Sequence, residues 1–208
     1  MDGQEYLNQI SATSKPAKKS MSGIFKSKFF IVGMVGIVGF IIIMIFGMIL
    51  GSGKGGEKDV GYALKLHLDN TSEIIKTYQS DVRSSNLRSS SASLYGLLTN
   101  VDRELTTYLT EKYKIKENQI EKKINKKIVK EATEAKDALS TELFGAKING
   151  ILDRIYAHKM AYEISLLITE EGKMAEITKD TALKESLETS CRSLENLYES
   201  FSGFSETK

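Results

Sequence analysis

Apolar residues recur through residues 58–203 at alternating spacings of four and three, the heptad pattern of helices packed side by side. Five such sets follow one another, within residues 64–82, 94–108, 120–146, 148–166 and 187–201. No segment alternates apolar and polar residues with a period of two, so we expect no strands. The pattern predicts an all-α domain: an antiparallel bundle of four to five long helices.

Local signals divide this domain into helices. Serine fills six of the eleven positions in residues 83–93, which predicts a break there, with one continuous helix as the alternative. The third helix is predicted over residues 116–146, and the Asn149-Gly150 pair either ends it or starts the next. The run Glu170-Glu171-Gly172 predicts the end of the fourth helix. Thr178 or Asp180 is expected to cap the last one.

Residues 29–50 form the most apolar segment, with no charged side chain in 22 positions. As a helix this segment would be about 33 Å long, enough to cross the hydrocarbon core of a bilayer. A buried helix of a soluble protein is one alternative. A signal peptide cleaved near Gly51, Ser52 and Gly53 is another, but its apolar part would be shorter, about 7–15 residues. The sequence predicts a single, uncleaved transmembrane helix.

The flanking charges predict how the chain lies in the membrane. Five lysines and no nearby acid precede the span, which favours a cytoplasmic N-terminus. We therefore expect a disordered cytoplasmic tail (residues 1–28), the transmembrane helix (29–50) and a flexible linker (51–57). An extracytoplasmic bundle (58–203) and a disordered C-terminus (204–208) would follow. The predicted location is a membrane, crossed once.

Glycines in the predicted span share one side of the helix. At 100° per residue they fall within about 120° of arc, so a second helix could approach closely. We predict association in the membrane through this glycine face, either with a second copy or with another membrane protein. The residues of the face are Gly33, Gly36, Gly39, Gly47 and Gly51.

The overall charge of +2, from 29 basic and 27 acidic residues, excludes a strongly basic nucleic-acid binder. A local lysine cluster in the third predicted helix could still contact a polyanion, although acids in residues 170–208 offset it. Neither arginine nor interleaved aromatics accompany these lysines, so no nucleic-acid partner is expected. The cluster consists of Lys116, Lys122, Lys123, Lys126, Lys127 and Lys130.

Candidate catalytic groups are few. The two histidines, His67 and His158, lie at the edges of apolar faces, and neither has metal-ligand spacing to a carboxylate. The Glu170-Glu171 pair fits a helix end and predicts no acid–base pair. Cys191 is expected to be a small buried apolar group, with a reactive or cross-linking thiol as the alternative. With no nucleotide-binding or hydrolase motif, we predict no metal, no cofactor and no enzymatic activity.

These features favour a membrane-anchored, non-catalytic interaction or scaffold protein whose partners include the lipid bilayer. The alternative is a polyanion or anionic-lipid surface binder that uses the lysine cluster of residues 116–130. A third hypothesis, an enzyme or cofactor carrier, would require a polar cavity inside the bundle.

Overall fold

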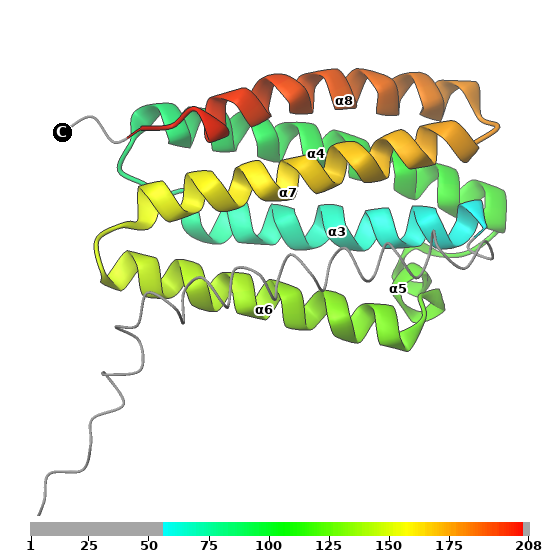
Figure 1. Ribbon diagram of the computed structural model, residues 1–208. Helices are drawn as coiled ribbons and strands as arrows, with labels where there is room; N and C mark the ends of the chain where they lie inside the picture. The colour runs from blue at the N-terminus through cyan, green and yellow to red at the C-terminus, as the bar shows by residue number, and fades with distance from the viewer. Residues whose placement is uncertain (1–55, 206–208) are drawn as a thin grey trace, which may run out of the picture. The chain divides into compact units, whose positions relative to one another are not determined.

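The computed structural model describes residues 56–205. This range holds five long helices and no strand, which confirms the prediction of an all-α helical bundle (Figure 1). The long helices are α3 (Glu57–Tyr78), α4 (Ser85–Tyr113), α6 (Lys126–Ile148), α7 (Leu152–Ile177) and α8 (Thr181–Ser202). The short helices η2 (Glu117–Gln119) and α5 (Ile120–Lys123) lie between α4 and α6.

The predicted membrane segment and its glycine face lie outside the described residues, as does the tail before them. Among the helices of residues 56–205, none combines the length and the apolar character needed to cross a bilayer.

Helices α3, α4, α8 and α7 pack in a ring of four, each against the next. The fifth long helix, α6, packs outside this ring, against both α3 and α7. Because α7 contacts α3, α6 and α8, it is buried on several sides. The core is mainly leucine and isoleucine, and Tyr62, Tyr156 and Phe201 are its largest fully buried side chains.

The break between the first two helices is shorter than predicted. Helix α3 ends at Tyr78 and α4 begins at Ser85, so most of the serine-rich segment is helical. The Ser84 hydroxyl accepts a hydrogen bond from the Leu87 amide and caps α4. Serine therefore begins a helix here rather than interrupting one.

Two predicted helix limits are wrong. The third long helix begins at Lys126 rather than at residue 116, because the Asn125 side chain caps it by accepting from the Lys127 amide. Helix α7 continues past Gly172 to Ile177, because Glu170 and Glu171 are buried instead of marking a solvent-exposed end.

Other limits are confirmed. Gly150 follows α6 with φ of +71°, a left-handed conformation that suits glycine at a helix end. Asp180 caps α8, and its carboxylate accepts from the Leu183 amide at 2.8 Å. The predicted fourth apolar face, in contrast, is misplaced. Its residues Ile155, Tyr162 and Leu166 are only partly buried, whereas Tyr156, Met160 and Ile164 are fully buried.

Candidate functional site

Helix α7 carries four charged side chains into the interior of the bundle. Lys159, Glu163, Glu170 and Glu171 are all buried. Burying a charge is costly unless a partner of opposite charge or hydrogen bonds compensate for it. The partners of these four residues therefore define the most unusual site in the described part of the chain.

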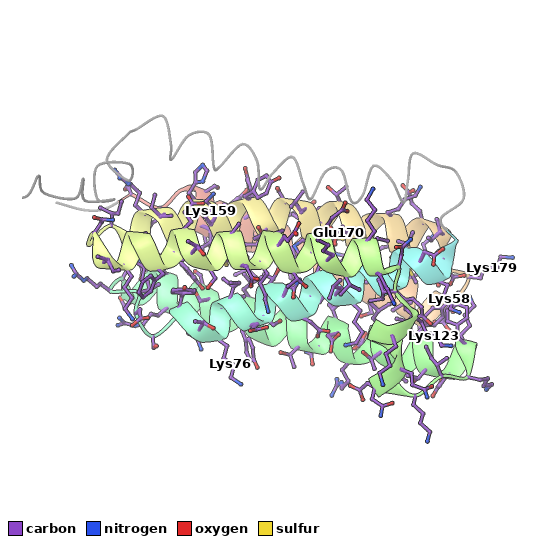
Figure 2. The ribbon with its side chains drawn as sticks, turned by 90° about the horizontal axis from the view of Figure 1, so that it is seen from below. Lys58, Lys76, Lys123, Lys159, Glu170 and Lys179 are labelled. Carbon is purple, nitrogen blue, oxygen red and sulfur yellow. The ribbon has the colours of Figure 1, made fainter. Side chains whose placement is uncertain are left out.

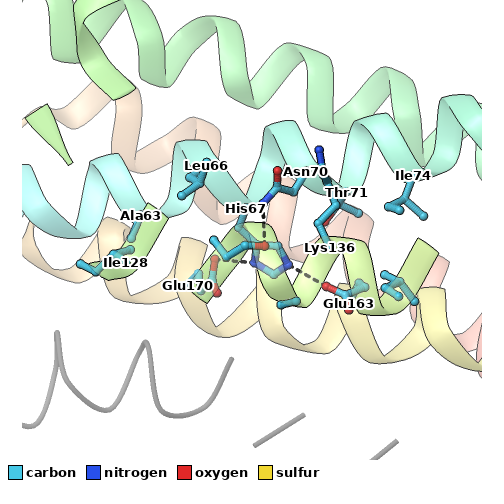
Figure 3. A pocket seen from close by; sticks show the side chains of 13 residues that line it. Ala63, Leu66, His67, Asn70, Thr71, Ile74, Ile128, Lys136, Glu163 and Glu170 are labelled. Atoms are coloured by element: carbon cyan, nitrogen blue, oxygen red, sulfur yellow. Dashed lines mark hydrogen bonds and ion pairs between the residues drawn. The ribbon is translucent and has the colours of Figure 1, made fainter. Parts of the chain in front are cut away.

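His67 on α3 lies between two of these glutamates (Figure 3). Its Nδ1 is 2.7 Å from Oε2 of Glu170, and its Nε2 is 2.8 Å from Oε2 of Glu163. The glutamates are seven residues apart, two turns of α7, so both point toward the same side of that helix. One imidazole therefore joins α3 to α7 at two points.

The surroundings of His67 decide its charge. Burial alone would lower the pKa of the imidazole, but the charge of Glu170 and the hydrogen bond to Glu163 outweigh burial and raise it to about 10. The imidazole is therefore a cation at neutral pH. Burial raises the pKa of Glu170, an effect that His67 opposes. Mainly through burial, the pKa of Glu171 is raised to about 8, so this group is largely protonated at pH 7.

A small cavity of about 50 Å³ lies beside His67, with α6 forming one wall (Figure 3). Thr71 and Glu170 line it, and each has one buried oxygen without a hydrogen-bond partner among the described residues, Oγ1 and Oε1 respectively. Aliphatic side chains from α3 and α6 make up most of the remaining wall. The lining is therefore mostly apolar, and the volume is far below the roughly 300–1,000 Å³ that small-molecule sites usually occupy.

The arrangement offers little for catalysis. Both nitrogens of His67 are engaged by carboxylates, so the ring has no free base to present to a substrate. Within residues 56–205, no group of three or more histidine, cysteine or acidic side chains is placed to hold a metal ion. The chemistry that the cluster performs is charge compensation between α3 and α7.

The second buried ion pair joins α6 to α7. The Nζ atom of Lys159 lies 2.8 Å from Oε2 of Glu142. Together with the His67 cluster, it fixes α7 to both of the helices that flank it on this side.

The predicted lysine cluster does not lie on one helix. Lys116, Lys122 and Lys123 belong to the segment between α4 and α6, whereas the other three begin α6. All six side chains are exposed. Figure 2 shows Lys123 at the same end of the bundle as Lys58, near the start of α3.

Large apolar side chains are exposed at the other end of α6. Phe144 is 56% exposed and Ile148 is 69% exposed, and the two lie one turn apart. Sequence reasoning placed Ile148 on the buried face of the fourth helix, and that placement is wrong. Ile148 is the last residue of α6, before the chain turns at Gly150.

Sequence reasoning missed the His67 cluster. Glu163 and Glu170 occupy the same heptad position as the buried Tyr156, seven residues earlier, and this spacing was the available signal. A charged residue at a heptad position that is otherwise buried and apolar predicts a buried charge with a partner of opposite charge. His158, in contrast, is exposed.

Neither the protein-family models, nor the curated proteins, nor the solved structures with which the chain was compared include a match to it.

Proposed function

We propose that this chain is a membrane-anchored, non-catalytic interaction protein that presents its helical bundle outside the cytoplasm. The observation that carries the proposal is the exposed pair Phe144 and Ile148 on α6. These are the two most exposed large apolar side chains of residues 56–205, and adjacent exposed apolar groups are typical of protein contacts. The anchor is the apolar segment of residues 29–50.

The partner we propose is a second copy of the chain. The glycine face predicted for the anchor would bring two copies together in the membrane. Identical bundles attached through identical linkers present Phe144 and Ile148 at the same height above the bilayer. The same patch on each copy can then meet its counterpart across a two-fold axis.

The interior supports a non-catalytic role. His67 is held on both sides by carboxylates, and the neighbouring cavity is smaller than ordinary sites for organic ligands. The buried polar groups hold the helices together. The proposed interaction with a partner therefore belongs to the surface of the bundle.

The test is photo-crosslinking in intact membranes, with a photoreactive amino acid in place of Phe144. We expect a covalent product of twice the chain mass. Tyr198 on α8, which is 41% exposed, is the matched control position and should give no such product. The double variant Phe144→Glu/Ile148→Glu, probed from the neighbouring Thr141, should lose the product.

Two results would contradict self-association: no product from position 144, or a product whose mass requires a different protein. Topology is tested on the same cells. Protease added outside should cleave the bundle only after it is destabilised, whereas antibodies should bind it directly. A bundle reached by antibody only after permeabilisation would contradict the proposed orientation.

A further inference from the structure

The stretch from the end of α4 to the first turns of α6 is the most basic part of the described chain. From residue 112 to residue 130 there are eight lysines and two glutamates, with no arginine or aspartate. The other end of the bundle is nearly balanced, with five basic and four acidic residues in 76–90, 144–155 and 195–205. Counted in the same way, over 56–62, 112–130 and 173–185, the end where α3 begins has twelve basic and seven acidic residues, and its excess of positive charge comes from the lysines of 112–130.

Apolar contacts hold this segment against the bundle. Ile120 in α5 and Ile124 just after it are both buried, and α5 packs against α3. Lys122 and Lys123 lie between these two isoleucines and are exposed. Because the isoleucines face the core and hold the segment in place, the two lysines project toward solvent.

The basic end is also the end where α3 begins. Lys112, at the end of α4, forms an ion pair with Glu57 at 2.7 Å, and the Nζ atom of Lys58 lies 5.2 Å from the ring centroid of Tyr113. These contacts join the first turn of α3 to the start of the lysine-rich segment. Figure 2 shows Lys58, Lys123 and Lys179 at this end.

Chain length limits how far this end can be from a membrane. Residues 51–56 alone separate the predicted span from Glu57, and six residues can extend over no more than about 20 Å. A linker this short lets the lysines come within about 8 Å of the bilayer, the Debye length at physiological salt over which anionic headgroups attract them.

We propose that residues 114–130 form a contact surface for the anionic lipid headgroups of the leaflet from which the bundle emerges. This surface holds the bundle upright, with its basic end against the membrane and the Phe144–Ile148 pair away from it. The inference rests on the anchor of the proposed function, but not on self-association.

Hydrogen exchange of the full-length chain in lipid nanodiscs tests the inference. Backbone amides of residues 114–130 should exchange more slowly in nanodiscs that contain phosphatidylglycerol than in purely zwitterionic ones. The difference should disappear at high salt, because screening weakens charge attraction.

Two variants with equal charge change provide the control. The variant Lys116→Glu/Lys122→Glu/Lys123→Glu should lose the lipid-dependent protection. The variant Lys76→Glu/Arg154→Glu/Arg192→Glu changes three exposed residues elsewhere and should keep it. Exchange in α7 and α8 reports whether either variant is misfolded.

Equal exchange in both lipids, or loss of protection in both variants, would overturn the proposal. Protection by added DNA or anionic wall polymer, but not by anionic lipid, would also overturn it and would identify a different polyanion. Crosslinking from position 144 in the lysine variant separates the two ideas. This variant should keep the crosslinked dimer, because self-association does not depend on the lysines. In the unsubstituted chain, a dimer without lipid-dependent protection contradicts the lipid contact, and protection without a dimer contradicts self-association.

Discussion

His67 and Glu170 are 103 positions apart in the sequence, yet Nδ1 of the histidine lies 2.7 Å from Oε2 of the glutamate inside the bundle. With the contact of Glu163 on the other ring nitrogen, this pairing fixes the register of α3 against α7. A one-turn slip would separate the imidazolium from both carboxylates and leave them buried without a cation.

Replacing His67 should therefore be costly. We expect His67→Gln to lower the free energy of unfolding by about 3–5 kcal/mol, because two buried glutamates lose their cation. His158→Gln, at the exposed histidine, should change stability by less than about 0.5 kcal/mol. Urea denaturation followed by circular dichroism measures both.

The triple variant His67→Gln/Glu163→Gln/Glu170→Gln tests the cause. It removes the imidazolium and both carboxylate charges together, so it should recover part of the stability that His67→Gln loses. A triple variant that is less stable than His67→Gln would contradict charge compensation as the role of this cluster.

Stability should fall as the pH rises. The pKa of His67 is raised from 6.5 to about 10 in the folded state, and that of Glu171 from 4.5 to about 8. The folded chain therefore binds more protons than the unfolded chain between these values, so the free energy of unfolding decreases through pH 6.5–10. Denaturant midpoints measured across this range check the direction.

Glu171→Gln separates the two contributions. It should weaken the decline between pH 4.5 and 8 and leave the decline between pH 6.5 and 10 that belongs to His67. A rise in stability with pH over this range would be incompatible with a cationic His67.

The Lys159–Glu142 pair gives a second test of interior charge. Lys159→Met leaves a nearly buried carboxylate without its cation and should cost about 3–5 kcal/mol. Adding Glu142→Leu should restore stability or exceed the original value, because apolar replacements avoid the desolvation of both charges. Thermal unfolding of the single and double variants distinguishes these outcomes.

Two glycines should respond differently to the same substitution. A Cβ at Gly61 would lie 2.9 Å from Cδ2 of Leu109, where α3 packs closely on α4, whereas a Cβ at Gly96 meets nothing within 4 Å. Gly96→Ala should stabilise by about 0.5–1 kcal/mol through helix propensity. Gly61→Ala should instead destabilise, since overpacking costs roughly 1–3 kcal/mol. If Gly61→Ala and Gly96→Ala have the same midpoint in chemical denaturation, the Leu109 side chain moves aside without loss of stability.

Cys191 should react slowly in the folded chain. Burial and the charges of Glu171 and Glu195 raise the pKa of its thiol to about 12, so little thiolate is present at neutral pH. Alkylation by iodoacetamide should be slow in buffer and fast in denaturant. Rapid labelling of the folded chain would restore the alternative of a thiol that cross-links two copies.

In the first three predicted helices, the heptad pattern predicted the buried residues more accurately than the limits of the helices. Ile120, Ile124 and Ile128 are four residues apart and were assigned to one helix, yet the chain turns at Asn125. The two isoleucines before the turn are buried, and Ile128 after it is partly buried. The spacing of apolar residues shows which side chains face the core. It does not reveal a turn after which the next apolar side chain still faces the core.

The pairing of residues within the His67 cluster could not be predicted for a different reason. Heptads assign residues to faces and not to neighbours, so nothing in the sequence pairs a histidine on the first helix with a glutamate on the fourth. Glu170 is only 1% exposed, and the charge of His67 that compensates for its burial is present only when α3 and α7 are adjacent.

The number of long helices in residues 56–205 is odd, and each reverses the direction of the one before it (Figure 1). The chain consequently enters the bundle at the basic end and leaves α8 at the opposite end. Helix α8, with 22 residues, is about 33 Å long. A bundle standing on its basic end would thus act as a spacer, and whatever is joined to its C-terminus would be carried about one helix length away from the lipid.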